Sequence, residues 1–320
     1  MKLITLLSIC IVLVLGGCGG GGPRHEPTEK YFLVCTNTKI PYWQEAGAGL
    51  VAAAKELGVQ AELVGPETYD PSAERDEFRR IVGKKPAGIL VSPGNAEVLK
   101  PEIDAAMAAG IPVITIDSDA PQSNRLFFVG TNNYQAGQMG GKHLAKLLNG
   151  KGSVVFFTIT GQTNLAERLN GYQAALAAFP GIKVAQVIDM KGDPRLAFDT
   201  VKSLLDKKTE VDAFVALEAL AGSEIAEVLE REKVTGKVIL AMDTAATTLE
   251  WISKGRIAAT IMQKPYTMGY YGLRALAEIV LDKPAGSKPM NATDPKAPYP
   301  VFIDTGTMLV DKDNLATVKK

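Results

Sequence analysis

The chain has 320 residues, of which 46% are hydrophobic and 22% are charged, as in an ordinary globular protein. This length allows two domains of usual size. Basic and acidic residues both number 35, so the chain lacks the basic excess that general nucleic-acid binding requires. The only histidines are His25 and His143, so we expect no histidine-built metal site or catalytic triad, and no cofactor.

The first 18 residues have the pattern of a secretion signal. Lys2 supplies a positive start, and the apolar run over 3–15 is short for a membrane span. The sequence Leu-Gly-Gly-Cys at 15–18 resembles a bacterial lipobox, in which Cys18 becomes the lipidated first residue; an ordinary signal peptide cleaved nearby is the alternative. Residues 19–29 are rich in glycine and proline, which predicts a flexible tether.

Strands and helices then alternate along the first half of the chain. We predict strands at 31–36, 60–65, 87–92 and 113–116, and helices at 42–57, 71–82 and 96–109. Cys35 lies in an apolar strand pattern, and we interpret it as a small buried hydrophobic residue rather than a nucleophile.

After residue 131 the alternation starts again. The pattern predicts helices at 135–148, 165–179, 196–205 and 222–233, and strands at 153–158, 184–189, 212–216 and 237–242. The tail adds a strand at 255–261, a helix at 266–281, a proline-rich loop at 283–300 and a last strand region at 301–310. Such alternation is typical of an α/β protein whose parallel sheets carry helices on both faces.

The two halves correspond to each other. Residues 87–91 match 212–216, and the helix over 49–57 matches that over 171–179. We therefore predict two similar doubly wound lobes, with a cleft between their carboxyl edges and a hinge of three crossings. The predicted limits are 31–131 with 264–303 for the N-terminal lobe, and 132–263 with 304–320 for the C-terminal lobe.

Aspartates follow equivalent strands in the two halves. Asp117 ends the apolar run Val-Ile-Thr-Ile, and Asp243 ends a similar run 126 positions later. In open α/β sheets, ligands bind outside the carboxyl ends of the strands. The pair therefore predicts a ligand site between the halves, although an aspartate at such a place can also cap the next turn.

Over about 31–310 the chain resembles periplasmic sugar-binding proteins of the ribose- and galactose-binding type, the solute receptors of ABC importers. The resemblance is carried by the motif Pro41-Tyr42-Trp43, the two aspartates, Arg168 within Ala-Glu-Arg-Leu-Asn-Gly-Tyr at 166–172, and Gln263 two residues before a proline. It implies the type I periplasmic binding protein fold. Repressors of the lactose type share this fold but carry an N-terminal helix-turn-helix, where this chain has a secretion signal.

The resemblance also implies a set of ligand contacts. The expected ligand-binding residues are Thr36, Tyr42, Trp43, Asp117, Ser118, Arg168, Asp193, Glu218, Asp243 and Gln263. Aromatic rings pack on the C–H faces of sugars, and a guanidinium donates a fork of hydrogen bonds to neighbouring hydroxyls.

Four departures from ribose receptors bear on the ligand. Ribose receptors have asparagine at Ile40, arginine at Ser118, asparagine at Glu218 and an aromatic contact within 191–194. The pocket is therefore expected to be more acidic. A neutral polyol, another sugar and an amine-bearing ligand all remain open.

The expected function is that of an extracytoplasmic receptor. It would capture a monosaccharide or polyol between its lobes and deliver it to the membrane permease of an ABC importer. We expect a monomeric, periplasmic or cell-surface lipoprotein that contacts membrane only through its Cys18 anchor and binds no metal or nucleic acid. A ligand sensor for a chemoreceptor or a sensor kinase is the alternative.

An enzyme is the less favoured alternative. Gly47 and Gly49 fit a loose dinucleotide-binding fingerprint, but the preceding strand ends about eleven residues earlier, where such glycines should follow it directly. We interpret these glycines as points of close packing in a helix. Paired aspartates could serve a sugar-processing glycosidase, which requires a defined separation between the two carboxyl groups.

Overall fold

The computed structural model describes residues 25–282 and 294–318. The predicted signal peptide, Cys18, the first part of the tether and residues 283–293 of the proline-rich loop lie outside the described residues. The end of the predicted tether is folded against the first lobe. There the hydroxyl of Tyr31 donates a hydrogen bond to Glu29 Oε2 at 2.9 Å, and the Glu26 N–H donates to Glu29 Oε1 at 2.9 Å.

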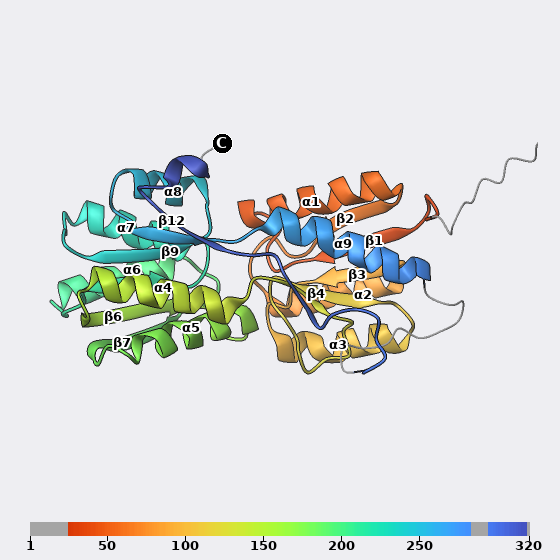
Figure 1. Cartoon of the computed structure of the whole chain (residues 1–320), viewed down its shortest axis with the longest axis horizontal. Helices are drawn as coiled ribbons and strands as arrows, with labels where there is room; N and C mark the ends of the chain where they lie inside the picture. The colour runs from red at the N-terminus through yellow and green to blue at the C-terminus, as the bar shows by residue number, and fades with distance from the viewer. Residues whose placement is uncertain (1–24, 283–293, 319–320) are drawn as a thin grey trace, which may run out of the picture.

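Two α/β lobes lie side by side (Figure 1). The first sheet has the strand order β11-β5-β4-β3-β1-β2, and its neighbouring strands are parallel. Its strands are β1 (Lys30–Val34), β2 (Gln60–Val64), β3 (Gly88–Val91), β4 (Val113–Ile116), β5 (Phe128–Gly130) and β11 (Phe302–Asp304). The helices around it are α1 (Pro41–Leu57), α2 (Pro71–Gly83), α3 (Ala96–Ala108) and α9 (Pro265–Asp282).

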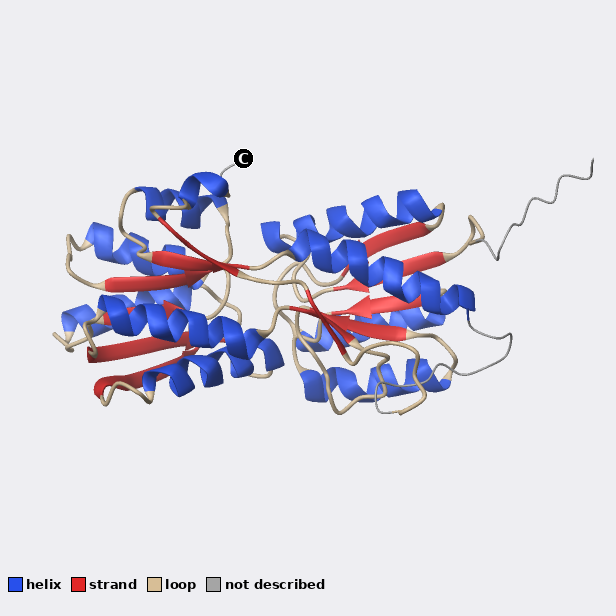
Figure 2. Cartoon of the chain, in the orientation of Figure 1, coloured by secondary structure: helices blue, strands red, loops and turns tan. Residues whose placement is uncertain are grey.

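The second sheet repeats this plan with the order β12-β10-β9-β8-β6-β7. Its strands are β6 (Lys151–Thr158), β7 (Gly181–Asp189), β8 (Ala213–Ala216), β9 (Val238–Met242), β10 (Ala259–Met262) and β12 (Met308–Asp311), of which β12 runs antiparallel to β10. The helices are α4 (Asn133–Leu147), α5 (Thr163–Leu176), α6 (Arg195–Asp206), α7 (Ala221–Arg231) and α8 (Ala246–Ser253), and a short 3-10 turn, η1 (Leu315–Thr317), follows. Figure 2 shows both sheets flanked by helices, which confirms the predicted doubly wound fold.

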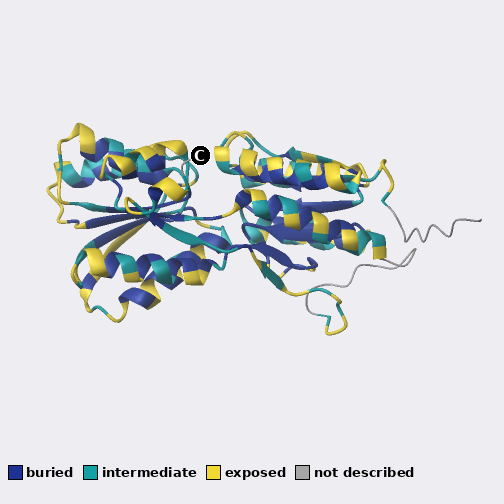
Figure 3. Ribbon diagram, turned by 45° about the horizontal axis from the view of Figure 1, so that its top comes forward, coloured by how far each residue is buried: buried dark blue, intermediate teal, exposed yellow. Residues whose placement is uncertain are grey.

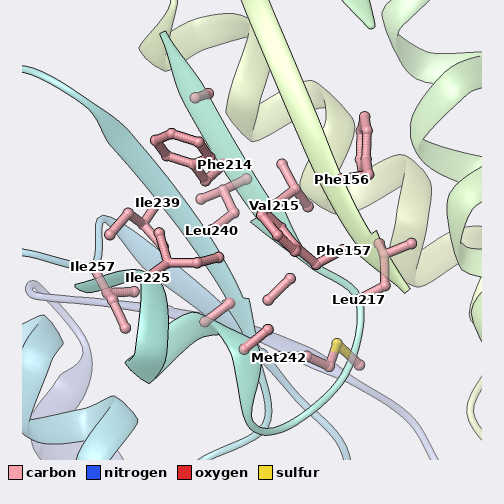
Figure 4. Close-up of a cluster of buried hydrophobic side chains, with 14 of the residues drawn as sticks. Phe156, Phe157, Phe214, Val215, Leu217, Ile225, Ile239, Leu240, Met242 and Ile257 are labelled. Carbon is pink, nitrogen blue, oxygen red and sulfur yellow. The ribbon is translucent and has the colours of Figure 1, made fainter. Parts of the chain in front are cut away.

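Each lobe has its own hydrophobic core. In Figure 3 the strands of both sheets are largely buried, whereas the outer faces of the helices are exposed. Figure 4 shows part of the second core, where Phe157 and Phe214 lie with their ring centroids 6.4 Å apart. Because the two cores are separate, the lobes can move relative to each other as rigid units without disrupting either core.

Three segments cross between the lobes, as the sequence predicts. They join β5 to α4, β10 to α9, and β11 to β12. The prediction of one strand region over 301–310 is wrong in detail, because Thr305, Gly306 and Thr307 separate two strands of different sheets. Gly306 has φ +81°, which few other residues tolerate. β5 and α8 are absent from the prediction; β5 has only three residues, too few to show a period.

The third crossing is bonded to the other two. The hydroxyl of Thr305 donates to the carbonyl of Gly130, at the end of β5, at 3.1 Å. The hydroxyl of Thr307 donates to the carbonyl of Met262, at the end of β10, at 2.7 Å. The three crossings therefore form one hydrogen-bonded hinge.

Glycines bring one pair of helices into backbone contact in each lobe. In the first lobe α1 packs on α9, and a Cβ on Gly49 would lie 2.0 Å from the carbonyl oxygen of Tyr266. In the second lobe α5 packs on α4, and a Cβ on Gly171 would lie 2.1 Å from the carbonyl oxygen of Tyr134. The interpretation of Gly47 and Gly49 as packing points is confirmed, since a Cβ on Gly47 would also meet the side chain of Leu63 at 3.0 Å.

Within the part of the chain that the structure describes, no helix combines the length and the apolar character needed to cross a bilayer.

Candidate ligand-binding site

A cavity lies between the lobes, at the carboxyl ends of strands from both sheets. Its volume is about 650 Å³, part of it open to solvent, which is within the usual range for a small-molecule site. Its walls combine polar side chains from both lobes with apolar and aromatic ones. The lining residues are Thr36, Asn37, Ile40, Tyr42, Trp43, Tyr69, Asp117, Ile159, Gln162, Asn164, Leu165, Arg168, Met190, Gly192, Pro194, Glu218, Ala219, Leu220, Asp243 and Gln263.

The two strand-end aspartates are equivalent in backbone geometry. Asp117 has φ 60° and Asp243 has φ 66°, in the left-handed region that aspartate enters more readily than most residues. Each backbone N–H donates to the neighbouring strand of its sheet, to Val129 at 3.0 Å and to Ile261 at 2.8 Å. The sharp turn at each strand end places both residues in the cavity wall, as the sequence predicts.

Asp117 is hydrogen-bonded from both lobes. The hydroxyl of Tyr42 donates to its Oδ1 at 2.6 Å, and the hydroxyl of Ser92 donates to Oδ2 at 3.3 Å. The side-chain amide of Asn164, from the other lobe, donates to the same Oδ2 at 3.2 Å. Burial raises the pKa of Asp117, and the hydrogen bond from Tyr42 counters that rise.

The carboxyl group of Asp243 accepts fewer hydrogen bonds than that of Asp117. Among the described residues, the one side-chain hydrogen bond to its carboxyl group comes from Gln263 Nε2, which donates to Oδ1 at 3.0 Å. Burial raises the pKa of Asp243 to about 7. Oδ2 is therefore available to accept a hydrogen bond from a ligand.

Arg168 is 1% exposed and is fixed by three hydrogen bonds. Nη1 donates to the carbonyl of Leu217, and Nη2 donates to Asn133 Oδ1 at 2.6 Å and to Gln263 Oε1 at 3.3 Å. Nε has no partner among the described residues. The cavity wall thus offers a free acceptor on Asp243, with which a ligand hydroxyl can pair. Arg168, whose Nε is buried and unpaired, also lines the cavity.

The aromatic pair predicted from the sequence forms part of the cavity wall. Tyr42 and Trp43 meet edge to face, with ring centroids 5.2 Å apart. Trp43 is 3% exposed, and its Nε1 donates to the hydroxyl of Thr36 at 3.1 Å. Both rings also pack in the first core, so they join the site to the body of the lobe.

Glu218 lines the cavity and also caps the start of a helix. Its carboxyl oxygens accept hydrogen bonds from the backbone N–H groups of Leu220 at 2.9 Å and Ala221 at 2.7 Å, at the start of α7. Burial raises its pKa, and these two hydrogen bonds counter the rise.

Two predicted site residues lie outside the lining. Ser118 is fully buried, and its hydroxyl lies 3.4 Å from that of Thr163, because the left-handed turn at Asp117 directs the next side chain away from the cavity. The carboxyl group of Asp193 is exposed and paired with Arg195 at 2.7 Å. Its neighbours Gly192 and Pro194 reach the cavity instead.

The sequence analysis missed several lining residues. Asn37 and Tyr69 come from the first lobe; Gln162 directly precedes α5, and Asn164 lies in its first turn. The signal for the latter two was present, since the polar segment over 160–164 follows a buried strand just as Asp117 does.

The lobes touch each other beside the cavity. Backbone and side-chain groups of Asp119 and Thr163 are hydrogen-bonded across the cleft, and the Ala96 N–H donates to the carbonyl of Gly161 at 3.2 Å. Gly192 packs so closely on Tyr69 that a Cβ there would lie 2.4 Å from the tyrosine. The structure is therefore one in which the cleft is closed.

A buried carboxyl lies behind the cavity wall. Glu74 is fully buried, its Oε2 accepts the Gly94 N–H at 2.9 Å, and its Oε1 has no partner among the described residues. Burial raises its pKa to about 8.

Cys35 is nearby and fully buried, and burial raises the pKa of its thiol to about 12, which confirms the prediction of an unreactive hydrophobic residue.

In the described ranges 25–282 and 294–318, no three histidine, cysteine or acidic side chains are grouped in a way that could hold a metal ion.

Comparisons with known proteins agree with this fold. The chain is 24% identical over 277 residues to the ribose import binding protein RbsB of Haemophilus influenzae, covering 85% of this chain and 91% of that protein. Among solved structures, the glucose-galactose binding protein GanP of Geobacillus stearothermophilus is 30% identical, with a TM-score of 0.82 over 90% of this chain and 99% of that one. An ABC transporter solute-binding protein of Burkholderia graminis, in complex with D-arabinose, is 26% identical, with a TM-score of 0.83 over 93% of this chain and 100% of that one.

These similarities extend over both lobes, and the family model matches residues 31–284. The resemblance to sugar-binding proteins and the type I fold stated from the sequence are confirmed. Proteins of this family bind solutes and are not enzymes. The chain belongs to the periplasmic binding protein domain family.

Proposed function

We propose that this chain is an extracytoplasmic receptor that captures a sugar or polyol between its lobes and delivers it to the permease of an ABC importer. Several relatives are named for the binding of ribose, allose, or glucose and galactose, and one solved structure is a complex with D-arabinose. The single observation that carries the proposal is an aromatic-walled cavity between the closed lobes, lined by Asp243 with a free Oδ2 and by the buried Arg168.

The chemistry of this pair suits vicinal hydroxyls. A hydroxyl donates one hydrogen bond and accepts others, so one sugar hydroxyl can donate to Asp243 while it or its neighbour accepts from Arg168. Tyr42 and Trp43 offer aromatic surface to the C–H face of the ring. An unpaired buried polar group costs about 1–3 kcal/mol, so a sugar that lacks the matching hydroxyl binds less well.

The two-lobe construction supplies the mechanism. A ligand touches residues of both lobes only when the cleft is closed, so its binding shifts the population toward the closed state. We propose that the moving units are 31–131 with 264–303, and 132–263 with 304–320. The permease would then recognise the closed arrangement of the two lobes.

The test is a thermal-shift and calorimetric screen of the purified protein against pentoses, hexoses and polyols. A ligand at a hundred times its dissociation constant adds about 2.7 kcal/mol to the free energy of unfolding. Asp243→Asn should abolish the shift, whereas Asp206→Asn, on the exposed end of α6, should leave it unchanged. If no sugar or polyol raises the melting temperature, the proposal is wrong.

We further propose that Cys18 is acylated, that residues 1–17 are removed so that Cys18 becomes the first residue, and that the receptor is a monomer anchored at the periplasmic or cell surface. Labelled fatty acid should enter the wild-type protein but not Cys18→Ala. Release of the Cys18→Ala protein in soluble form would support the anchor, and retention on the membrane would contradict it.

A further inference from the structure

A second cavity opens from the ligand site. Its volume is about 440 Å³ including its mouth, and six residues line both it and the main cavity. The shared residues are Ile40, Tyr42, Ala219, Leu220, Asp243 and Gln263. We call the second cavity the side pocket; the residues that line it alone are Pro41, Glu45, Thr244, Ala245 and Pro265.

The side pocket differs from the main cavity in its chemistry. The main cavity is lined by Asp117, Asn164, Arg168 and Glu218, none of which reaches the side pocket. The side pocket is lined largely by alanine, proline, isoleucine and leucine side chains. Its own polar lining residues are Glu45 and Thr244, one from each lobe.

Each lobe contributes apolar residues to the boundary between the two spaces. Ile40 comes from the first lobe, just before α1, and Leu220 comes from the second lobe, just before α7. Asp243 and Gln263 also face both spaces. A ring hydrogen-bonded to Asp243 in the main cavity therefore has an edge directed at the mouth of the side pocket.

We propose that the natural ligand is a sugar carrying an uncharged, partly apolar substituent, such as a glycoside, and that the side pocket holds this substituent. This inference rests on the proposed function and narrows its ligand class. A free monosaccharide would leave the side pocket filled with water against apolar walls. A substituent that displaces such poorly held water adds affinity without a new hydrogen bond.

The first experiment compares free sugars with their glycosides by titration calorimetry. The probes are D-glucose, D-galactose and D-arabinose, each with its methyl and phenyl glycosides in both anomeric forms. We expect at least one phenyl glycoside to bind about tenfold more tightly than its parent sugar, with the methyl glycoside between them.

The outcomes separate the two proposals. If parent sugars bind and every glycoside binds more weakly, the side-pocket inference is wrong and the proposed function stands. If neither sugars nor glycosides bind, the proposed function fails and this inference fails with it.

A second experiment fills the side pocket. Ala245→Phe should weaken binding of the phenyl glycoside at least tenfold and that of the parent sugar less than threefold. The matched control is Ala246→Phe, at the adjacent exposed position that does not line the pocket. It should change neither affinity.

Equal weakening of both ligands by Ala245→Phe, in a variant with native circular dichroism, would overturn the inference. If that variant does not fold, Thr244→Leu narrows the same pocket from the adjacent position and is read in the same way.

Discussion

The hydroxyl of Thr163 is hydrogen-bonded to both backbone polar groups of Asp119 across the cleft. It accepts the Asp119 N–H at 2.9 Å and donates to the Asp119 carbonyl at 2.7 Å. Thr163 begins α5 in the second lobe, and Asp119 follows β4 in the first, two residues after the site aspartate Asp117. One side chain thus satisfies two backbone groups only when the lobes are together.

Thr163→Val should therefore weaken closure. The variant keeps the shape of the side chain but leaves both backbone groups without their partner, which costs about 1–3 kcal/mol in the closed state. We expect ligand affinity to fall about tenfold and the radius of gyration of the ligand-free protein, measured by X-ray scattering, to rise. Thr209→Val, on an exposed turn, is the control and should change neither. Unchanged affinity in Thr163→Val would show that these bonds do not hold the cleft.

Ligand affinity should depend on pH through Asp243. Burial raises the pKa of this carboxyl to about 7 in the free protein, and a sugar hydroxyl donates to its ionised form. Below pH 7 the carboxyl must lose a proton on binding, so affinity should fall, by about tenfold per pH unit well below the pKa. Calorimetry between pH 5.5 and 8.5 measures this. Asp243→Asn should show weak binding with little pH dependence, and a flat profile in the wild type would contradict the prediction.

Stability should depend on pH through Glu74. Its pKa is about 8 in the folded protein against a usual value of 4.5, because the carboxyl is buried. The folded state therefore binds this proton more strongly, and the stability that it contributes at low pH is lost as pH rises from about 4.5 through 8. Glu74→Gln removes this pH-dependent loss of stability, because the glutamine amide does not ionise. Relative to wild type, it should be more stable at pH 8.5 by on the order of 4–5 kcal/mol, since the pKa lies about 3.5 above its usual value and each pKa unit corresponds to about 1.4 kcal/mol.

The measurement for Glu74→Gln is the melting temperature between pH 4.5 and 8.5. At pH 4.5 the variant and wild type should differ little. The matched control is Glu97→Gln, on the exposed first turn of α3. A variant that is less stable than wild type at pH 8.5 would mean that Glu74 is ionised and supported in the folded protein.

Alanine at the helix contacts should be destabilising. In Gly171→Ala the new Cβ would lie 2.1 Å from a carbonyl oxygen of α4, so the two helices must separate. We expect a loss of about 1–3 kcal/mol, measured by urea unfolding. Gly83→Ala is the matched control because nothing lies within 4 Å of its added Cβ, and it should be neutral or slightly stabilising. Equal effects at the two positions would rule out the backbone contact as the cause.

The fold was largely predictable because the hydrophobic pattern repeats. Buried parallel strands give continuous apolar runs, and the two halves carry the same succession of elements. Because ligands in open α/β sheets bind at the carboxyl ends of the strands, Asp117 and Asp243 could be expected to line one cavity, and they do. The short β5 was not predictable, since a strand of three residues shows no period. The division of 301–310 between two sheets was not predictable either, since β11 pairs with β5 in one lobe and β12 with β10 in the other, and these partners are distant in sequence.

The side-chain directions within the site were less predictable. Ser118 was expected at the ligand because it stands where ribose receptors have an arginine, but the left-handed backbone at Asp117 turns it toward Thr163. Arg168 lies at the cavity, yet most of its hydrogen-bonding capacity is used by its own lobe and by Gln263. These outcomes depend on backbone angles and on partners far away in sequence, which a pattern of residue types does not contain.

The hydrogen bonds of Thr305 and Thr307 bear on how the lobes can move. Thr305 joins the third crossing to the end of β5, where the first crossing begins. Thr307 joins it to the end of β10, where the second crossing begins. A sliding of one lobe along the other would have to break at least one of these bonds, whereas a rotation about the tied crossings preserves both. Opening of the receptor should therefore have a single rotational degree of freedom, so that intermediate positions of the lobes lie along one arc.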